Sequence, residues 1–190
     1  MKNEHETIRG LPYFVGLTSK ELEIAGRALS PVEVASGEAI FAQGEDGGWI
    51  YVLARGTAEI AIECPLLPAE GAASTALNAG NRSVGERRVL ASLCAPALLG
   101  EMSVLLEEPR SAWAIATSPC LLLQVSREEM RRALEANHKW AQSLLLAMSK
   151  ILAARVAEMN RHLVALSLRE DHKLQDTELD ILQQSLYRHE

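Results

Sequence analysis

The pattern of hydrophobic and polar positions changes twice along the chain and divides it into three parts. Residues 32–63 alternate between apolar and polar over short runs, with turn sequences at 36–37, 44–48 and 55–56. Alternation of this kind is typical of strands with one buried face, and closely spaced turns are typical of an antiparallel barrel or sandwich. In one such run the apolar Ala58, Ile60 and Ile62 alternate with polar residues, which predicts a half-buried strand.

Helical periods lie on both sides of this region. Before it, the sequence T-S-K-E at 18–21 is a capping box, with Thr18 at the cap and Glu21 at the third helical position. Leu22, Ala25 and Leu29 then share one helical face, and Ser30 and Pro31 end the element. A second capping box, S-R-E-E at 126–129, predicts that the chain is helical from there to its end.

Three further apolar runs, 88–93, 112–117 and 121–125, predict more strands. Between the two groups of strands, residues 65–86 are rich in Ala, Gly, Ser and Pro and have no period. A connection of this length is either functional or disordered, and we expect a long, disordered loop. The fold class is therefore α+β: an antiparallel β-roll, or jelly roll, between an N-terminal helix and a long C-terminal helix.

The last part carries a near-heptad apolar stripe, with spacings of 3, 4, 4, 3, 4 and 3, formed by Leu145, Met148, Leu152, Val156, Met159, Leu163 and Leu166. Such a stripe either packs on the β-roll or pairs with a second copy of the chain. Its 22 residues span about 33 Å, more than a roll of this size covers. We therefore expect a homodimer through this helix, followed by a short helix after Asp171. The expected domains are residues 1–130, a β-roll with a helical start, and residues 131–190, a lid and dimerisation helix with its tail.

Composition narrows the possible functions. The 190 residues carry a formal net charge of −6, with no basic patch, which argues against nucleic acid as a partner. The start of the chain lacks the apolar core of a signal peptide, and the apolar helix is interrupted by charges, so neither secretion nor a membrane is expected. Three cysteines far apart favour a reducing cytoplasm. Residues 6–137 contain no histidine, which argues against a histidine-ligated metal and against a histidine general base in that region. The pattern is that of a binding protein, not an enzyme.

The candidate ligand-binding residues lie in the segment 100–112, G-E-M-S-V-L-L-E-E-P-R-S-A. A helical turn starting at Gly100 and Glu101 aims free N–H groups outward, and a carboxylate there can accept hydrogen bonds from the vicinal hydroxyls of a ribose. Arg110 supplies a planar cationic fork for phosphate oxygens. The alternatives are a surface ion pair of Arg110 with Glu107 or Glu108 and, for Glu101, a carboxylate that merely stabilises a helix start.

This segment resembles the phosphate-binding cassette of the cyclic nucleotide-binding domain family, which includes the catabolite activator protein and the regulatory subunits of protein kinase A. The cassette runs Gly-Glu-(Leu/Met)-(Ala/Ser)-Leu-Leu, several variable residues, then Pro-Arg-(Ala/Ser/Thr)-Ala, and the spacing of nine from Glu101 to Arg110 matches the kinase type. Upstream, G-E-A-I-F-A-Q-G-E-D-G-G-W-I-Y-V-L-A-R-G at 37–56 is similar to the family's glycine-rich block. The resemblance covers about residues 10–165.

The resemblance implies that Glu101 binds the ribose 2′-hydroxyl and that Arg110 binds the exocyclic phosphate oxygens. The amides of Met102, Ser103 and Ala112 and the hydroxyl of Ser111 are expected to complete the phosphate cradle with Gly100. A C-terminal helix closes over the base in the family, and Arg155 is the expected base contact here.

The expected ligand is cAMP, with cGMP or a cyclic dinucleotide as alternatives, and no cofactor or metal is expected. The residues after Leu166 are too few for the helix-turn-helix region of the family's transcription factors, so we expect a sensor that acts on an unidentified effector protein. A second hypothesis is a protein-interaction module whose pocket is no longer used. A phosphodiesterase lacks the required metal cluster or nucleophile–base pair in the central region.

Overall fold

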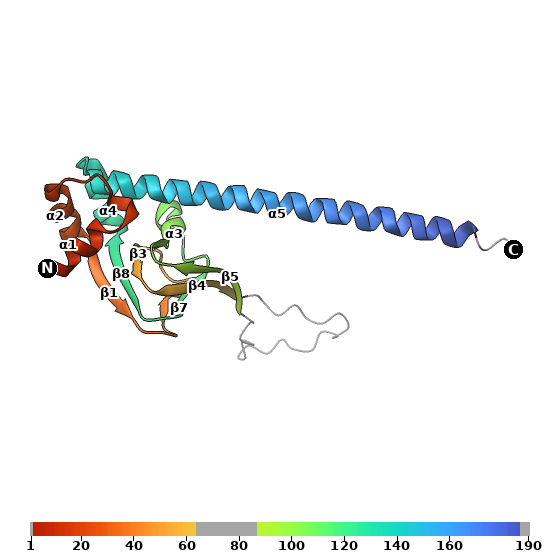
Figure 1. The fold of residues 1–190 in the computed structure, drawn as a ribbon, viewed down its shortest axis with the longest axis horizontal. Helices are drawn as coiled ribbons and strands as arrows, with labels where there is room; N and C mark the ends of the chain where they lie inside the picture. Colours follow the sequence, from red (N-terminus) through yellow and green to blue (C-terminus); the bar gives the residue numbers. More distant parts are fainter. Residues whose placement is uncertain (1, 64–86, 187–190) are drawn as a thin grey trace. The chain divides into compact units, whose positions relative to one another are not determined.

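Two four-stranded antiparallel sheets and several helices make up the described part of the chain (Figure 1). The computed structural model describes residues 2–63 and 87–186. Its helices are α1 (Lys2–Arg9), the short 3₁₀ turn η1 (Pro12–Phe14), α2 (Ser19–Ala28), α3 (Glu101–Leu106), α4 (Arg127–Glu135) and α5 (Lys139–Leu186). Its strands are β1 (Ser30–Val34), β2 (Ala39–Phe41), β3 (Trp49–Arg55), β4 (Thr57–Glu63), β5 (Arg87–Cys94), β6 (Ala97–Leu99), β7 (Trp113–Ala116) and β8 (Cys120–Ser126).

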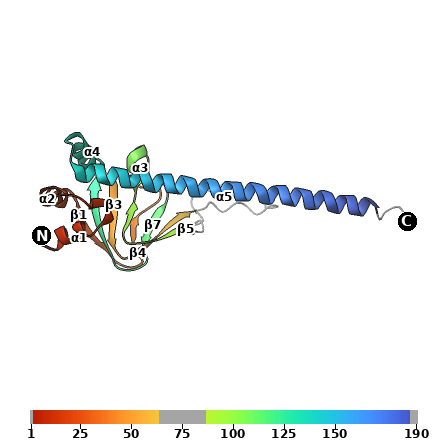
Figure 2. The same cartoon turned by 45° about the horizontal axis from the view of Figure 1, so that its top comes forward.

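The strand order is β1-β8-β3-β6 in one sheet and β2-β7-β4-β5 in the other. Strands that are consecutive along the chain therefore alternate between the sheets, as in a roll, except that β4 and β5 pair with each other in one sheet. Every pairing is antiparallel. Figures 1 and 2 show α1, α2 and α4 gathered at one end of the roll, away from β5. The α+β roll between helices that the periodicity predicts is thereby confirmed.

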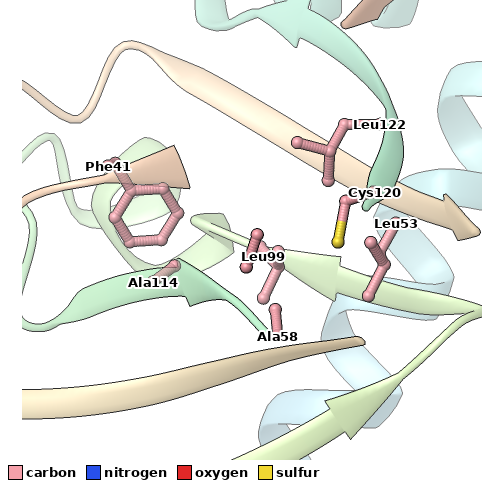
Figure 3. Packing of buried hydrophobic residues seen from close by; sticks show 8 residues of the cluster. Phe41, Leu53, Ala58, Leu99, Ala114, Cys120 and Leu122 are labelled. Atoms are coloured by element: carbon pink, nitrogen blue, oxygen red, sulfur yellow. The ribbon is translucent and has the colours of Figure 1, made fainter. Parts of the chain in front are cut away.

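The inside of the roll is a small apolar core to which both sheets contribute (Figure 3). Its buried residues are Phe41, Leu53, Ala58, Leu99, Ala114, Ala116, Cys120 and Leu122. The tight turn between β3 and β4 belongs to this packing. Gly56 has φ +95°, and a Cβ there would lie 2.6 Å from the carbonyl oxygen of Pro119 and 2.7 Å from Cys120 Sγ. Only glycine fits such a position, because the backbone is left-handed and a side chain has no room.

The predicted helix starts are present in the structure. Thr18 Oγ1 accepts a hydrogen bond from the N–H of Glu21, and the Glu21 carboxylate accepts one from the N–H of Thr18, so the capping box is complete. Ser126 Oγ likewise accepts from the N–H of Glu129 at the start of α4. The first cap begins α2 ahead of the roll, and the second marks where the chain passes from β8 into α4.

The structure also departs from the predicted elements. In β4 a bulge between Ile60 and Ala61 reverses the alternation, so that Ala61 is buried, at 2% exposure. The helices α1 and η1 and the three-residue β6 were not predicted, because short segments carry little periodic signal. The C-terminal helical region is broken at Asn137, which has φ +58°, and then continues without a further break to Leu186. The prediction of a separate helix after Asp171 is therefore wrong, because α5 runs through this position.

The chain divides into two compact units, residues 1–145 and 146–190, and α5 contributes to both. The first unit contains the roll and the start of α5, where Trp140, Ala141 and Leu144 are buried. The predicted loop 65–86 lies outside the described residues. No helix in the described part of the chain is long and apolar enough to cross a membrane.

Candidate functional site

The segment 100–112 connects β6 to β7 and contains α3. The entry into α3 is fixed by Gly100, which has φ +79° and ψ +10° and is the N-terminal cap. A Cβ at this position would lie 2.2 Å from Arg110 Nη1 and 2.9 Å from the carbonyl oxygen of Trp49. Gly100 is therefore required twice, by its left-handed backbone and by the close approach of the arginine. The guanidinium of Arg110 therefore lies against Gly100, the cap of α3, although the two residues are ten positions apart in the sequence.

Arg110 is buried, with 3% of its surface exposed. Its Nη2 donates to the carbonyl oxygen of Trp49 at 2.7 Å, and its Nη1 donates to that of Gly100 at 3.1 Å. Its Nε is also buried and has no hydrogen-bond partner. The guanidinium lies 4.3 Å from the centre of the Phe41 ring, which in turn stacks on Tyr51. A buried arginine held on main-chain carbonyls does not suit the alternative of a surface ion pair.

Burial lowers the pKa of Arg110 from its ordinary value, and the neighbouring Tyr51, Glu45, Asp46 and Glu101 partly oppose that shift by favouring the charged form. A guanidinium stays protonated even so. Desolvation nonetheless raises the free energy of the cation, because the interior solvates a charge less well than water does. An anion placed against this group would offset that cost.

The loop between β2 and β3 holds Arg110 from the other side. The N–H of Gly44 donates to the carbonyl oxygen of Arg110 at 2.8 Å, and the N–H of Arg110 donates to that of Glu45 at 2.8 Å. Gly47 packs so closely on α3 that a Cβ there would lie 2.2 Å from the Cβ of Ser103. The β2–β3 loop and the segment 100–112, more than fifty residues apart in the sequence, thus pack against each other around the arginine.

The structure brings most of the predicted site residues together. Those on α3 or its cap are Gly100, Glu101, Met102 and Ser103, and those on the irregular stretch before β7 are Arg110, Ser111 and Ala112. Glu101 and Ser103 are buried, at 2% and 4% exposure, and Met102 and Ser111 are exposed. Arg155 belongs to the second unit, so its part in the site stays a prediction.

Sequence reasoning missed the partners of the arginine. The carbonyl oxygen of Trp49 and the ring of Phe41 carry no motif that marks them, since one is a main-chain atom and the other is a core residue. Arg127, whose Nη2 donates to the carbonyl oxygen of Ser103 at 3.2 Å, was also missed. The sequence signal for Gly47 existed, because it lies in a predicted turn, but its contact with α3 depends on the fold.

The chain is similar to known proteins in sequence and in fold. The family model described as "Cyclic nucleotide-binding domain" matches residues 31–137, more than half of the chain. The chain is 30% identical over 163 residues to the "Cyclic AMP receptor protein" of Thermus thermophilus, covering 86% of this chain and 65% of that protein. It is 29% identical over 107 residues to the "cAMP-dependent protein kinase regulatory subunit" of Mycosarcoma maydis, covering 56% of this chain and 19% of that one. The chain thus spans less than two thirds of the length of either relative.

Among solved structures, the catabolite activator protein of Thermus thermophilus superposes with a TM-score of 0.61 at 29% identity, over 82% of this chain and 63% of the other. The regulatory domain of Toxoplasma gondii PKA with cAMP gives a TM-score of 0.56 at 20% identity, over 78% and 49% of the two chains, and shares the fold. The roll, the buried arginine after α3 and the matching family model lead to one conclusion: this chain belongs to the cyclic nucleotide-binding domain family.

Proposed function

We propose that this protein is a receptor for a cyclic nucleotide, cAMP in the first place, and that the segment 100–112 binds the sugar phosphate. The proposal assigns binding rather than catalysis, because residues 6–137 contain no histidine to act as a general base. It places the receptor in the cytoplasm, where unpaired thiols such as those of Cys94 and Cys120 persist.

The observation that carries the proposal is the buried Arg110, whose Nε has no hydrogen-bond partner. A phosphate diester has one negative charge and two exocyclic oxygens, and a guanidinium can meet both oxygens at once. The first-turn amides of α3, those of Met102 and Ser103, have no helical acceptor and supply further donors. With the Ala112 amide and the Ser111 hydroxyl, these groups form the proposed phosphate cradle.

Glu101 is the proposed ribose ligand. Its carboxylate is buried at the start of α3, where a negative charge is favoured by the helix. A carboxylate accepts hydrogen bonds from a 2′-hydroxyl, and the eight residues between Glu101 and Arg110 form the helix and turn that bring acid and cation to one site. The ribose and the phosphate are thus read by two different side chains.

The choice of cAMP rests on the relatives, two of which carry cAMP in their names. The proposed site residues contact the phosphate and the ribose, which cAMP, cGMP and cyclic dinucleotides have in common, so these contacts do not distinguish the three ligand classes. The test is therefore a thermal-unfolding screen with all three classes. A ligand at about 100 times its Kd adds about 2.7 kcal/mol to the free energy of unfolding, which raises Tm by several degrees. A shift with cAMP alone supports the proposal. A shift with another class reassigns the base, and no shift with any class favours the interaction-module hypothesis.

Signalling is proposed to run through the C-terminal helix, with Arg155 contacting the base and an effector protein reading the movement. In the part of α5 that belongs to the second unit, apolar side chains of the stripe are exposed: Val156 at 51%, Met159 at 57% and Leu163 at 58%. The side chain of Leu166 lies outside those described. An exposed apolar stripe at heptad spacing is the pattern of a helix that pairs with a second copy.

We expect the double substitution Met159→Glu with Leu163→Glu to dissociate a dimer, because it places unpaired carboxylates in an apolar seam. Light scattering after size-exclusion chromatography measures the change in mass. The matched control, Ala154→Glu with Ala165→Glu, adds the same charge about half a helical turn away from the stripe. Dissociation by both pairs, or a wild-type protein that is monomeric at tens of micromolar with and without cAMP, contradicts the dimer.

A further inference from the structure

Arg127 is the first residue of α4, and it joins three separate parts of the first unit. Its N–H, which has no acceptor inside the helix, donates to the carbonyl oxygen of Gly48 at 2.8 Å. Its side-chain Nη2 donates to the carbonyl oxygen of Ser103 at 3.2 Å, and its Nε is buried without a hydrogen-bond partner. One residue thereby connects α4 both to the start of β3 and to α3.

The carbonyl oxygen of Ser103 accepts the main-chain hydrogen bonds that end α3. It accepts from the N–H of Glu107, the cap residue with φ +58°, and from the N–H of Glu108 at 3.2 Å. Arg127 adds a charged donor to the same oxygen, and hydrogen bonds from charged donors are stronger than neutral ones. The end of a six-residue helix, too short to be stable alone, is therefore held from outside.

Arg127 and Arg110 donate hydrogen bonds to two consecutive residues. The carbonyl oxygen of Gly48 accepts from the main chain of Arg127, and that of Trp49 accepts from the side chain of Arg110. The same stretch packs on Ser103, because Gly47 leaves no space for a Cβ between them. A shift of α4 that carries Arg127 with it therefore acts on α3 and on the main chain that holds Arg110.

From these contacts we infer that Arg127 is a positioning residue for the anion site. It does not touch the ligand. Its guanidinium fixes α3 against α4, so that the α3 amides and Glu101 stay in register with Arg110. The start of α4 is consequently linked to the site through Arg127.

The test compares Arg127→Leu and Arg127→Lys with Ser126→Ala. Both Arg127 variants keep the main-chain bond to Gly48, and lysine keeps one charged donor for the Ser103 carbonyl. Ser126→Ala removes the cap of α4 without touching α3, so it serves as the control for a general loss of helix stability. Two quantities are measured: the exchange rates of the α3 amide hydrogens without ligand, and the Kd for cAMP by calorimetry.

We expect Arg127→Leu to speed exchange in α3 and to weaken cAMP binding about tenfold, as for the loss of one charged hydrogen bond. Arg127→Lys should stay within about threefold of the wild type, and Ser126→Ala should lower Tm while leaving Kd within about twofold. Unchanged α3 exchange in Arg127→Leu, or an equal loss of affinity in Ser126→Ala, overturns the inference. Only the affinity readout rests on the proposed function: if the wild type binds no cyclic nucleotide, that function fails, and α3 exchange alone decides the role of Arg127.

Discussion

Replacement of Arg110 by alanine is expected to weaken cyclic nucleotide binding a hundredfold or more while the roll still folds. Each hydrogen bond to a charged group contributes about 1.5–3 kcal/mol, and the guanidinium is expected to make two of them to the phosphate. Arg110→Lys should recover only part of the loss, since an ammonium keeps the charge but not the planar fork. Calorimetry with cAMP gives the affinities, and circular dichroism reports whether the fold is kept.

Arg110→Ala also removes contacts within the protein, so a loss of stability has to be distinguished from a loss of ligand contacts. The side chain also ties together the carbonyl oxygens of Trp49 and Gly100, so some loss of stability is expected. Arg131→Ala, which removes an exposed arginine paired with Glu135, controls for the loss of one positive charge. Binding by Arg110→Ala within about threefold of the wild type, in a folded protein, removes Arg110 from the site.

The second large effect is expected for Gly100→Ala. Alanine at φ +79° costs about 1–2 kcal/mol, and its Cβ would lie 2.2 Å from Arg110 Nη1, so the guanidinium has to move. We expect lower stability together with a loss of cAMP affinity of at least tenfold, because the displaced arginine no longer faces the start of α3. Thermal unfolding and calorimetry measure the two effects separately.

Gly37 offers a matched control for this substitution. It has φ +88°, yet a Cβ there meets nothing within 4 Å. Gly37→Ala therefore imposes the same backbone strain without the collision. It should lower Tm to a similar extent and leave cAMP affinity unchanged. Equal losses of affinity in both variants indicate that stability alone, and not the position of Arg110, explains the result for Gly100→Ala.

The sequence predicted the roll well because its signals are local. The turns at 36–37, 44–48 and 55–56 and the capping box at Thr18 each involve neighbouring residues, and the structure has a turn or a helix start at all of them. The β4 bulge was not predictable in this way. It depends on how β5 pairs with β4, which a single strand's alternation does not contain.

The site was predictable in its residues but not in its geometry. The spacing of Glu101 and Arg110 singled out the right segment for comparison with a known family. That Arg110 is buried on two carbonyls, and that Arg127 is connected to the same segment, depends on contacts between residues about sixty and twenty-four apart. Such main-chain acceptors cannot be predicted from the residue type, because every amino acid placed at position 49 or 103 would have the same carbonyl group.

The end of the second helical region shows a further limit. The stripe from Leu145 to Leu166 predicted a long helix, but a helix that continues to Leu186 could not be told from two helices by apolar spacing. After Asp171 the apolar Leu179, Leu182 and Leu186 share one helical face, but this spacing is the same in a new helix and in the continuation of the old one.

The crystal structure of the protein with cAMP is the most direct test of the proposed site. We expect one nucleotide per chain, with the exocyclic phosphate oxygens within hydrogen-bond distance of the Arg110 guanidinium and the ribose 2′-hydroxyl on the Glu101 carboxylate. A nucleotide bound elsewhere on the chain, or one bound here with its phosphate turned away from Arg110, contradicts it.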